Sequence, residues 1–153
     1  MHLSKTDRIL KHAATLGPLG YFPAAPGTWG SAAGVLLVLL LPQDTVLLLL
    51  VVLALMVFGA VASAAAERVT GETDSGHIII DEVAGMMVST LFLPHTTAYL
   101  ASAFILFRFF DILKPFPIRS LESSLKGGVG VMADDIAAGV MANGVLQIWK
   151  TIS

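Results

Sequence analysis

The stretch VLLLLVVLALMVFGAVASAAA, residues 46–66, contains no charged residue and no proline. A helix needs about 20 mostly apolar residues to cross the hydrocarbon core of a bilayer, and this stretch meets that requirement unaided. Inside a bilayer the backbone must satisfy its own hydrogen bonds, which a helix does within one segment. Residues 46–66 therefore predict a transmembrane helix and indicate an integral membrane protein.

Four further apolar runs lie on either side of this stretch. They occupy residues 31–41, 83–93, 98–107 and 129–148. Only the last approaches 46–66 in length, so the other three must tilt, borrow flanking polar residues or re-enter the membrane. We expect an all-α, polytopic membrane protein: a bundle of about four to five short transmembrane or re-entrant helices that forms one membrane-embedded domain over residues 1–153.

The composition agrees with this class of protein. Hydrophobic residues make up 56% of the 153 positions and charged residues 13%, against about 25% charged residues in soluble domains. The net charge of −2 offers no basic surface for nucleic acid, so no nucleic-acid partner is expected. The absence of cysteine removes disulfides and thiolate chemistry. Any catalysis must therefore use oxygen, nitrogen, or a metal held by oxygen.

The N-terminal segment, residues 1–15, carries Lys5, Arg8 and Lys11. It lacks the long apolar core and the small-residue cleavage pattern of a secretory signal. Apolar residues between the charges predict a short N-terminal helix that lies at the membrane interface. A solvated, frayed terminus is equally compatible with these residues.

The distribution of basic residues predicts the orientation, because cytoplasmic segments retain positive charge. The turns at 42–45 and 94–97 contain no Lys or Arg, whereas residues 108–128 contain four. The N-terminus, residues 67–82 and residues 108–128 are therefore expected on the cytoplasmic side. Five crossings would leave the C-terminus outside, where Lys150 opposes the rule.

This orientation brings four polar motifs to one face of the membrane. They are the Pro-Gly stretch at 23–30, Asp81 with Glu82, residues 108–114, and Asp134 with Asp135. A bound divalent cation is the usual way to keep neighbouring carboxylates ionised in a low-dielectric setting, and oxygen-only ligands indicate magnesium, with manganese as a substitute. The structural alternative is that the acids lie in the first turns of their helices and cap the N-termini.

Two glycines stand beside these acids. Gly85 follows Asp81 by four residues, and Gly139 follows Asp135 by the same spacing. Residues four apart share one face of a helix, so each carboxylate has a position without a side chain next to it. Small residues let membrane helices approach closely. We therefore expect these two helices to pack against each other near their carboxylates.

Arg108, Asp111 and Lys114 recur every three residues and line one side of a helix end, which Pro115 and Pro117 terminate. This row of cation, anion and cation suits a phosphate group together with a metal. The structural alternative is an arginine that snorkels to the interface and makes a local ion pair.

Three further polar residues are weaker candidates. Residues 21–31 predict a rigid turn that feeds a helix, with Thr28 and Ser31 able to cap the helix N-terminus. Exposed amides there can bind an anion, although a plain membrane-entry loop is the commoner meaning. His77, which precedes the run into Asp81, is a supporting candidate. His95 falls on the opposite face and is not expected to contribute.

Taken together, these motifs resemble the phosphatidylglycerophosphatase A family. The matching segments are FPAAPGTWGS at 22–31, HIIIDEVAG at 77–85, FRFFDILKPFPI at 107–118 and GVGVMADDIAAG at 128–139. They span most of the chain in the expected order, and the polar positions show no departure from the family pattern.

The resemblance implies a magnesium-dependent phosphatase of the bacterial inner membrane that converts phosphatidylglycerophosphate to phosphatidylglycerol and inorganic phosphate. The expected partners are the lipid bilayer and this phospholipid substrate, with the active site facing the cytoplasm. Because the chain has no cysteine and no Asp-x-Asp motif, the economical mechanism is a carboxylate-bound metal that polarises the phosphate and activates water. An aspartyl-phosphate intermediate stays open.

The expected catalytic residues are Asp81, Glu82, Asp111, Asp134 and Asp135. The expected metal ligands are Asp81, Glu82, Asp134 and Asp135, and the expected substrate-binding residues are Arg108, Lys114, Thr28, Ser31 and His77.

Two other classes of protein remain as alternatives. An ion or proton transporter also places carboxylates in membrane helices, but near the middle of the bilayer and open to both sides. A noncatalytic membrane scaffold would not need two acidic pairs beside arginine and lysine.

Overall fold

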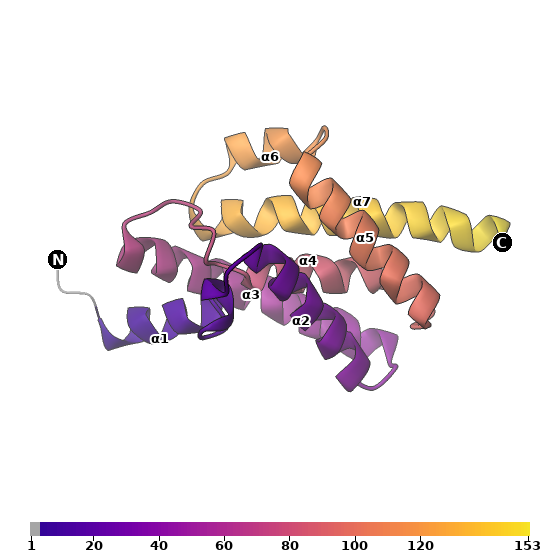
Figure 1. The fold of residues 1–153 in the computed structure, drawn as a ribbon, viewed down its shortest axis with the longest axis horizontal. Coiled ribbons are helices and arrows are strands. Elements are labelled where there is room, and N and C mark those ends of the chain that lie inside the picture. Colours follow the sequence, from indigo (N-terminus) through magenta and orange to yellow (C-terminus); the bar gives the residue numbers. More distant parts are fainter. Residues whose placement is uncertain (1–3) are drawn as a thin grey trace.

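The computed structural model describes residues 4–153, and all regular structure in that range is helical (Figure 1). The helices are α1 (Lys5–Ala14), α2 (Pro26–Leu40), α3 (Thr45–Thr70), α4 (Ile80–Thr90), α5 (Thr97–Leu113), α6 (Ile118–Ser124) and α7 (Gly127–Ile152), with a 3₁₀ turn, η1, at Leu19–Tyr21. The prediction of an all-α fold is confirmed. α6 and η1 were not expected from the sequence.

The two longest apolar runs form α3 and α7. Both helices are long and apolar enough to cross a membrane, and α2 is a shorter apolar helix. α3 also exposes a continuous row of large side chains, which includes Leu50, Leu53 and Val57. Such a surface suits lipid rather than water. The fold is therefore that of a membrane protein, and the count of four to five crossings stays a prediction.

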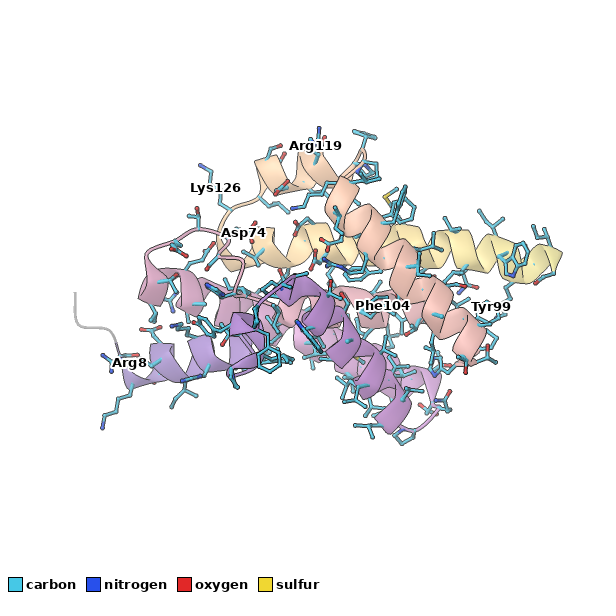
Figure 2. The ribbon with its side chains drawn as sticks, in the orientation of Figure 1. Arg8, Asp74, Tyr99, Phe104, Arg119 and Lys126 are labelled. Carbon is cyan, nitrogen blue, oxygen red and sulfur yellow. The ribbon has the colours of Figure 1, made fainter. Side chains whose placement is uncertain are left out.

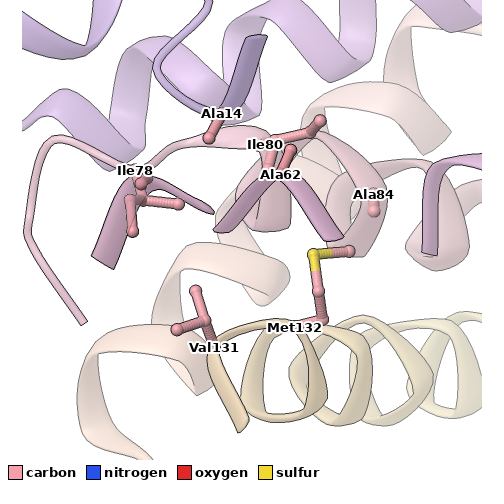
Figure 3. Packing of buried hydrophobic residues seen from close by; sticks show 8 residues of the cluster. Ala14, Ala62, Ile78, Ile80, Ala84, Val131 and Met132 are labelled. Carbon is pink, nitrogen blue, oxygen red and sulfur yellow. The ribbon is translucent and has the colours of Figure 1, made fainter. Parts of the chain in front are cut away.

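The short helix α4 lies at the centre of the bundle, where it packs against α2, α3, α5 and α7. Ten of its eleven residues are buried, so the helix that carries Asp81 and Glu82 is also the core of the molecule. Figure 3 shows part of this core, where Ile80 and Ala84 of α4 meet Ala62 of α3 and Met132 of α7.

Polar side chains of α7 bind carbonyl groups just beyond the C-terminal end of α4, where the helix's own hydrogen bonds have ended. Asn143 Nδ2 and Gln147 Nε2 donate to the carbonyl oxygen of Leu91 at 2.7 and 3.1 Å. Lys150 Nζ donates to the carbonyl oxygen of Phe92 at 3.0 Å. Lys150, which opposed the expected charge distribution, therefore has a structural partner.

α4 and α7 cross at Gly85 and Gly139. A methyl group built on Gly139 would collide with the carbonyl oxygen of Gly85, and one built on Gly85 would lie 2.5 Å from the carbonyl oxygen of Asp135. The two backbones are therefore in direct contact, as the glycine spacing predicted. Because Asp81 and Asp135 each precede their glycine by one turn, the crossing holds both acids close together.

The N-terminal helix is confirmed over residues 5–14, whereas residues 1–3 of the predicted segment lie outside the described residues. α1 packs against α3, and Arg68 donates to Asp7 across this contact at 2.7 Å. Its position at the membrane interface stays a prediction.

The crossing predicts that alanine substitutions at two glycines of α7 have very different effects on stability. Gly139→Ala should lower the free energy of unfolding of the protein in detergent by about 1–3 kcal/mol, because the added methyl overpacks the contact with Gly85. Gly144→Ala is the matched control, since no atom lies within 4 Å of the added methyl, and it should be neutral or stabilising. Equal stability of the two variants would contradict the crossing.

Candidate active site

Three carboxylates meet beside the crossing. Asp81 and Glu82 come from the first turn of α4, and Asp135 comes from α7. One oxygen of each lies within 4.8 Å of the other two. Asp81 is 6% exposed and Asp135 is 3% exposed, so the group lies almost entirely inside the protein. We call these three residues the carboxylate triad.

Each member of the carboxylate triad has an oxygen without a partner. Oδ1 of Asp81, Oε2 of Glu82 and Oδ2 of Asp135 are buried and make no hydrogen bond. Buried polar atoms are normally paired, because an unpaired buried charge costs several kcal/mol. Unpaired oxygens of this kind are compensated either by a cation or by protons. Oxygen donors of this kind fit a hard divalent cation such as magnesium.

Helix capping does not account for all of these acids. Asp81 and Glu82 lie in the first turn of α4, where the helix dipole favours negative charge, but Asp134 and Asp135 do not lie in the first turn of α7. Ile79 occupies the N-cap position of α4 without a side-chain hydrogen bond. Asp134 and Asp135 lie about two turns after Gly127, the first residue of α7, beyond the four free N–H groups at a helix start. The expectation that this pair lies in the first turns of its helix is therefore wrong.

Asp134 has a different partner from its neighbour Asp135. Its Oδ2 accepts a hydrogen bond from Lys114 Nζ at 2.7 Å, and the same Nζ donates to Glu122 Oε1 at 2.7 Å. Burial alone would lower the pKa of Lys114, but the hydrogen bonds to Asp134 and Glu122 outweigh it and raise that pKa above its ordinary value. Lys114 therefore stays a cation, and Asp134 is compensated without joining the carboxylate triad.

Arg108 and Asp111 form an ion pair across one turn of α5. The Arg108 side chain is only 16% exposed, which is inconsistent with an arginine that snorkels into water. A methyl group built on Gly27 would lie 2.8 Å from Arg108 Nη1 and would collide with Glu82 Oε1. The start of α2 therefore lies against both the guanidinium and the carboxylate triad, and a side chain at position 27 would displace the ends of Glu82 and Arg108.

These contacts confirm that the four polar motifs come together. Gly27, Glu82 and Arg108 belong to three different motifs and lie against one another. Lys114 donates a hydrogen bond to Asp134, which belongs to the fourth motif. Figure 2 shows other charged side chains, such as Asp74, Arg119 and Lys126, around α6 and its neighbouring loops. Tyr99 and Phe104 lie on the part of α5 that is away from α6. Charge therefore gathers at one end of the bundle.

The weaker candidates have other roles in the structure. α2 begins at Pro26 with Ala25 as its N-cap and no side-chain cap, so the expectation that Thr28 and Ser31 cap this helix is wrong. Ser31 is buried and donates to the carbonyl oxygen of Gly27 at 2.8 Å, whereas Thr28 is exposed. Ser31 therefore supports the turn that holds Gly27.

His77 and His95 lie away from the described contacts of the triad. His77 Nδ1 lies 2.9 Å from the carbonyl oxygen of Gly20, and its ring stacks on Tyr21, so it ties the loop after α1 to the segment before α4. His95 lies in the turn between α4 and α5, at the far end of α5 from Arg108.

Sequence reasoning missed Glu122 and the contact role of Gly27. Glu122 belongs to α6, a short helix that carries no long apolar run, so no pattern linked it to Lys114. Gly27 lies within a motif that the sequence analysis singled out, but its contacts with Glu82 and Arg108 depend on the packing of α2 against α4 and α5.

This fold and site define a helical membrane protein with a buried carboxylate triad, an arginine and a lysine at one end of the bundle. Comparison with protein families gives a match over residues 12–150 to the model described as phosphatidylglycerophosphatase A. The chain belongs to this family.

Three relatives show the extent of the similarity. A phosphatidylglycerophosphatase A of Haemophilus influenzae is 40% identical over 80% of this chain and 77% of its own length. A phosphatidylglycerophosphatase A of Escherichia coli is 37% identical over 83% of this chain and 75% of its own length. A Bacteroides thetaiotaomicron protein, provisionally named phosphatidylinositol-3-phosphatase, is 39% identical over 79% of this chain and 80% of its own length. No solved structure gave a significant match.

Proposed function

We propose that this protein hydrolyses the terminal phosphomonoester of phosphatidylglycerophosphate to give phosphatidylglycerol and inorganic phosphate. The observation that carries the proposal is the carboxylate triad, whose buried oxygens lack partners, beside the Arg108 guanidinium in a member of this family. The names of the Haemophilus influenzae and Escherichia coli relatives support the choice of substrate.

The proposed cofactor is Mg²⁺, with Mn²⁺ as a substitute, held by Asp81, Glu82 and Asp135. When bound, such an ion supplies Lewis acidity to a phosphate oxygen and lowers the pKa of a coordinated water. The donor geometry supports these three ligands. Asp134, which the sequence also suggested as a ligand, is assigned here to holding Lys114 in place.

The basic residues have separate tasks in this proposal. Arg108 offers a planar fork that can bind two phosphate oxygens at once, and Asp111 fixes the orientation of that fork. Lys114 supplies a second permanent positive charge for the lipid-side phosphodiester. During hydrolysis the water oxygen bonds to phosphorus and the bond from phosphorus to the glycerol oxygen breaks. The attacking water gives up one proton, and the departing glycerol oxygen gains one, so phosphatidylglycerol leaves as the free alcohol.

The proposed location is the bacterial inner membrane, with several crossings and the site at the cytoplasmic face. The starts of α2 and α4, the end of α5 and the early part of α7 all contribute to the site, so one end of the bundle meets the lipid phosphates. Seven of the nine Lys and Arg residues lie in residues 5–11 and 108–126, and the second of these ranges includes the end of α5, which supports the cytoplasmic side. A transporter would instead need access from both faces.

Phosphate release tests this function directly. The purified protein with Mg²⁺ should release phosphate from phosphatidylglycerophosphate and much more slowly from phosphatidylinositol 3-phosphate, whose inositol ring is bulkier than glycerol. EDTA should abolish release, and added Mg²⁺ or Mn²⁺ should restore it. No release from the glycerol lipid would refute the proposed substrate, and full turnover in EDTA would refute the metal.

Arg108→Lys tests the role of the planar fork. This change keeps the charge but loses the geometry, so kcat should fall by about 10²–10³-fold, as it does when a donor to the transition state is lost. Arg119→Lys makes the same chemical change on exposed α6 and should leave kcat near that of the wild type. An Arg108→Lys enzyme with unchanged kcat would show that Arg108 only supports the fold.

A further inference from the structure

An apolar groove of about 540 Å³ lies between α2 and α5. α2 contributes Ala32, Val35 and Leu39 to its wall, and α5 contributes Leu100, Ala101 and Phe104. The two alanines belong to different helices and supply only methyl groups to the wall. Figure 1 shows α2 and α5 running alongside each other, away from the end of the bundle that holds the charged residues.

The groove begins close to the candidate active site. Ile105, its last wall residue on α5, precedes Arg108 by three residues, which is about one helical turn. The wall on α5 extends from there to Thr97, a length of about 12 Å along the helix at 1.5 Å per residue. The groove therefore leads from the guanidinium toward the other end of α5.

We propose that this groove holds one acyl chain of the phospholipid substrate while its phosphate lies at Arg108. The inference rests on the proposed function, because it takes the substrate to be a lipid with a terminal phosphate. The same two helices carry the proposed phosphate site and the groove: Gly27 of α2 lies against Arg108 of α5, and the nearest groove residues follow within one to two turns on each helix. A lipid whose phosphate lies at Arg108 can therefore place one chain along this groove as the chain enters the bilayer.

The groove contributes orientation more than affinity. Lipid tails around the protein are as apolar as the groove wall, so a chain gains little free energy by leaving the bilayer for it. A chain held in the groove nevertheless limits how the head group turns, and orientation of the reacting phosphate raises the rate. The effect should therefore depend on chain length and should be lost with short chains.

Tryptophan substitutions test this dependence. Ala32→Trp and Ala101→Trp fill the groove from opposite walls, and both should lower kcat/KM for the dioleoyl substrate by about tenfold, in the range for one misfitting apolar group. Both should leave kcat/KM for the dihexanoyl substrate unchanged. Ala54→Trp is the matched control, because Ala54 is exposed on α3 and does not line this groove. Equal losses on both substrates, or the same loss in the control, would overturn the proposal.

A binding measurement separates this inference from the proposed reaction. Wild-type protein in EDTA is irradiated with phosphatidylglycerophosphate that carries a diazirine in one acyl chain, and separately with the matching phosphatidylcholine. Stronger labelling of 32–39 and 97–105 by the phosphatidylglycerophosphate probe supports the groove, even if no phosphate release is found. Equal labelling by both probes would show bulk lipid only, and the absence of labelling in these segments would equally overturn the proposal.

Discussion

The close contact of Gly85 with Gly139 is the constraint on which the rest of the structure depends. It brings the backbones of α4 and α7 together one turn from Asp81 and Asp135, and a side chain on either glycine would collide with backbone atoms of the other helix. α4 is also the core helix. Any change at this crossing therefore affects both the packing of the bundle and the spacing of the acids.

Compensation of charge explains why the surrounding residues are arranged as they are. Asp134 is neutralised by Lys114, and Asp111 is neutralised by Arg108, whereas the carboxylate triad keeps oxygens without partners. A buried group of like charges is stable only with a cation or with protons. The structure therefore separates two kinds of acid: those that position basic side chains, and those whose buried oxygens have no basic partner.

The sequence predicted the parts that depend on local pattern. Apolar runs located α3 and α7, and the spacing of Gly85 and Gly139 from their acids predicted the crossing. Long-range pairing was harder to predict, because Asp134 and Asp135 are adjacent in sequence yet have different partners, and only the path of the chain after α5 brings Lys114 to one of them. Thr28 and Ser31 were misread as helix caps because α2 begins at Pro26, before both of them.

Anomalous scattering from manganese tests the central claim most directly, because it locates the ion without relying on activity. In crystals of the protein grown with Mn²⁺, the account predicts a peak at coordinating distance from carboxylate oxygens of Asp81, Glu82 and Asp135, and the loss of that peak in Asp135→Asn. A peak bound by Asp134 away from the triad would contradict the account. So would an empty triad in crystals of a protein that hydrolyses the lipid in the same manganese buffer.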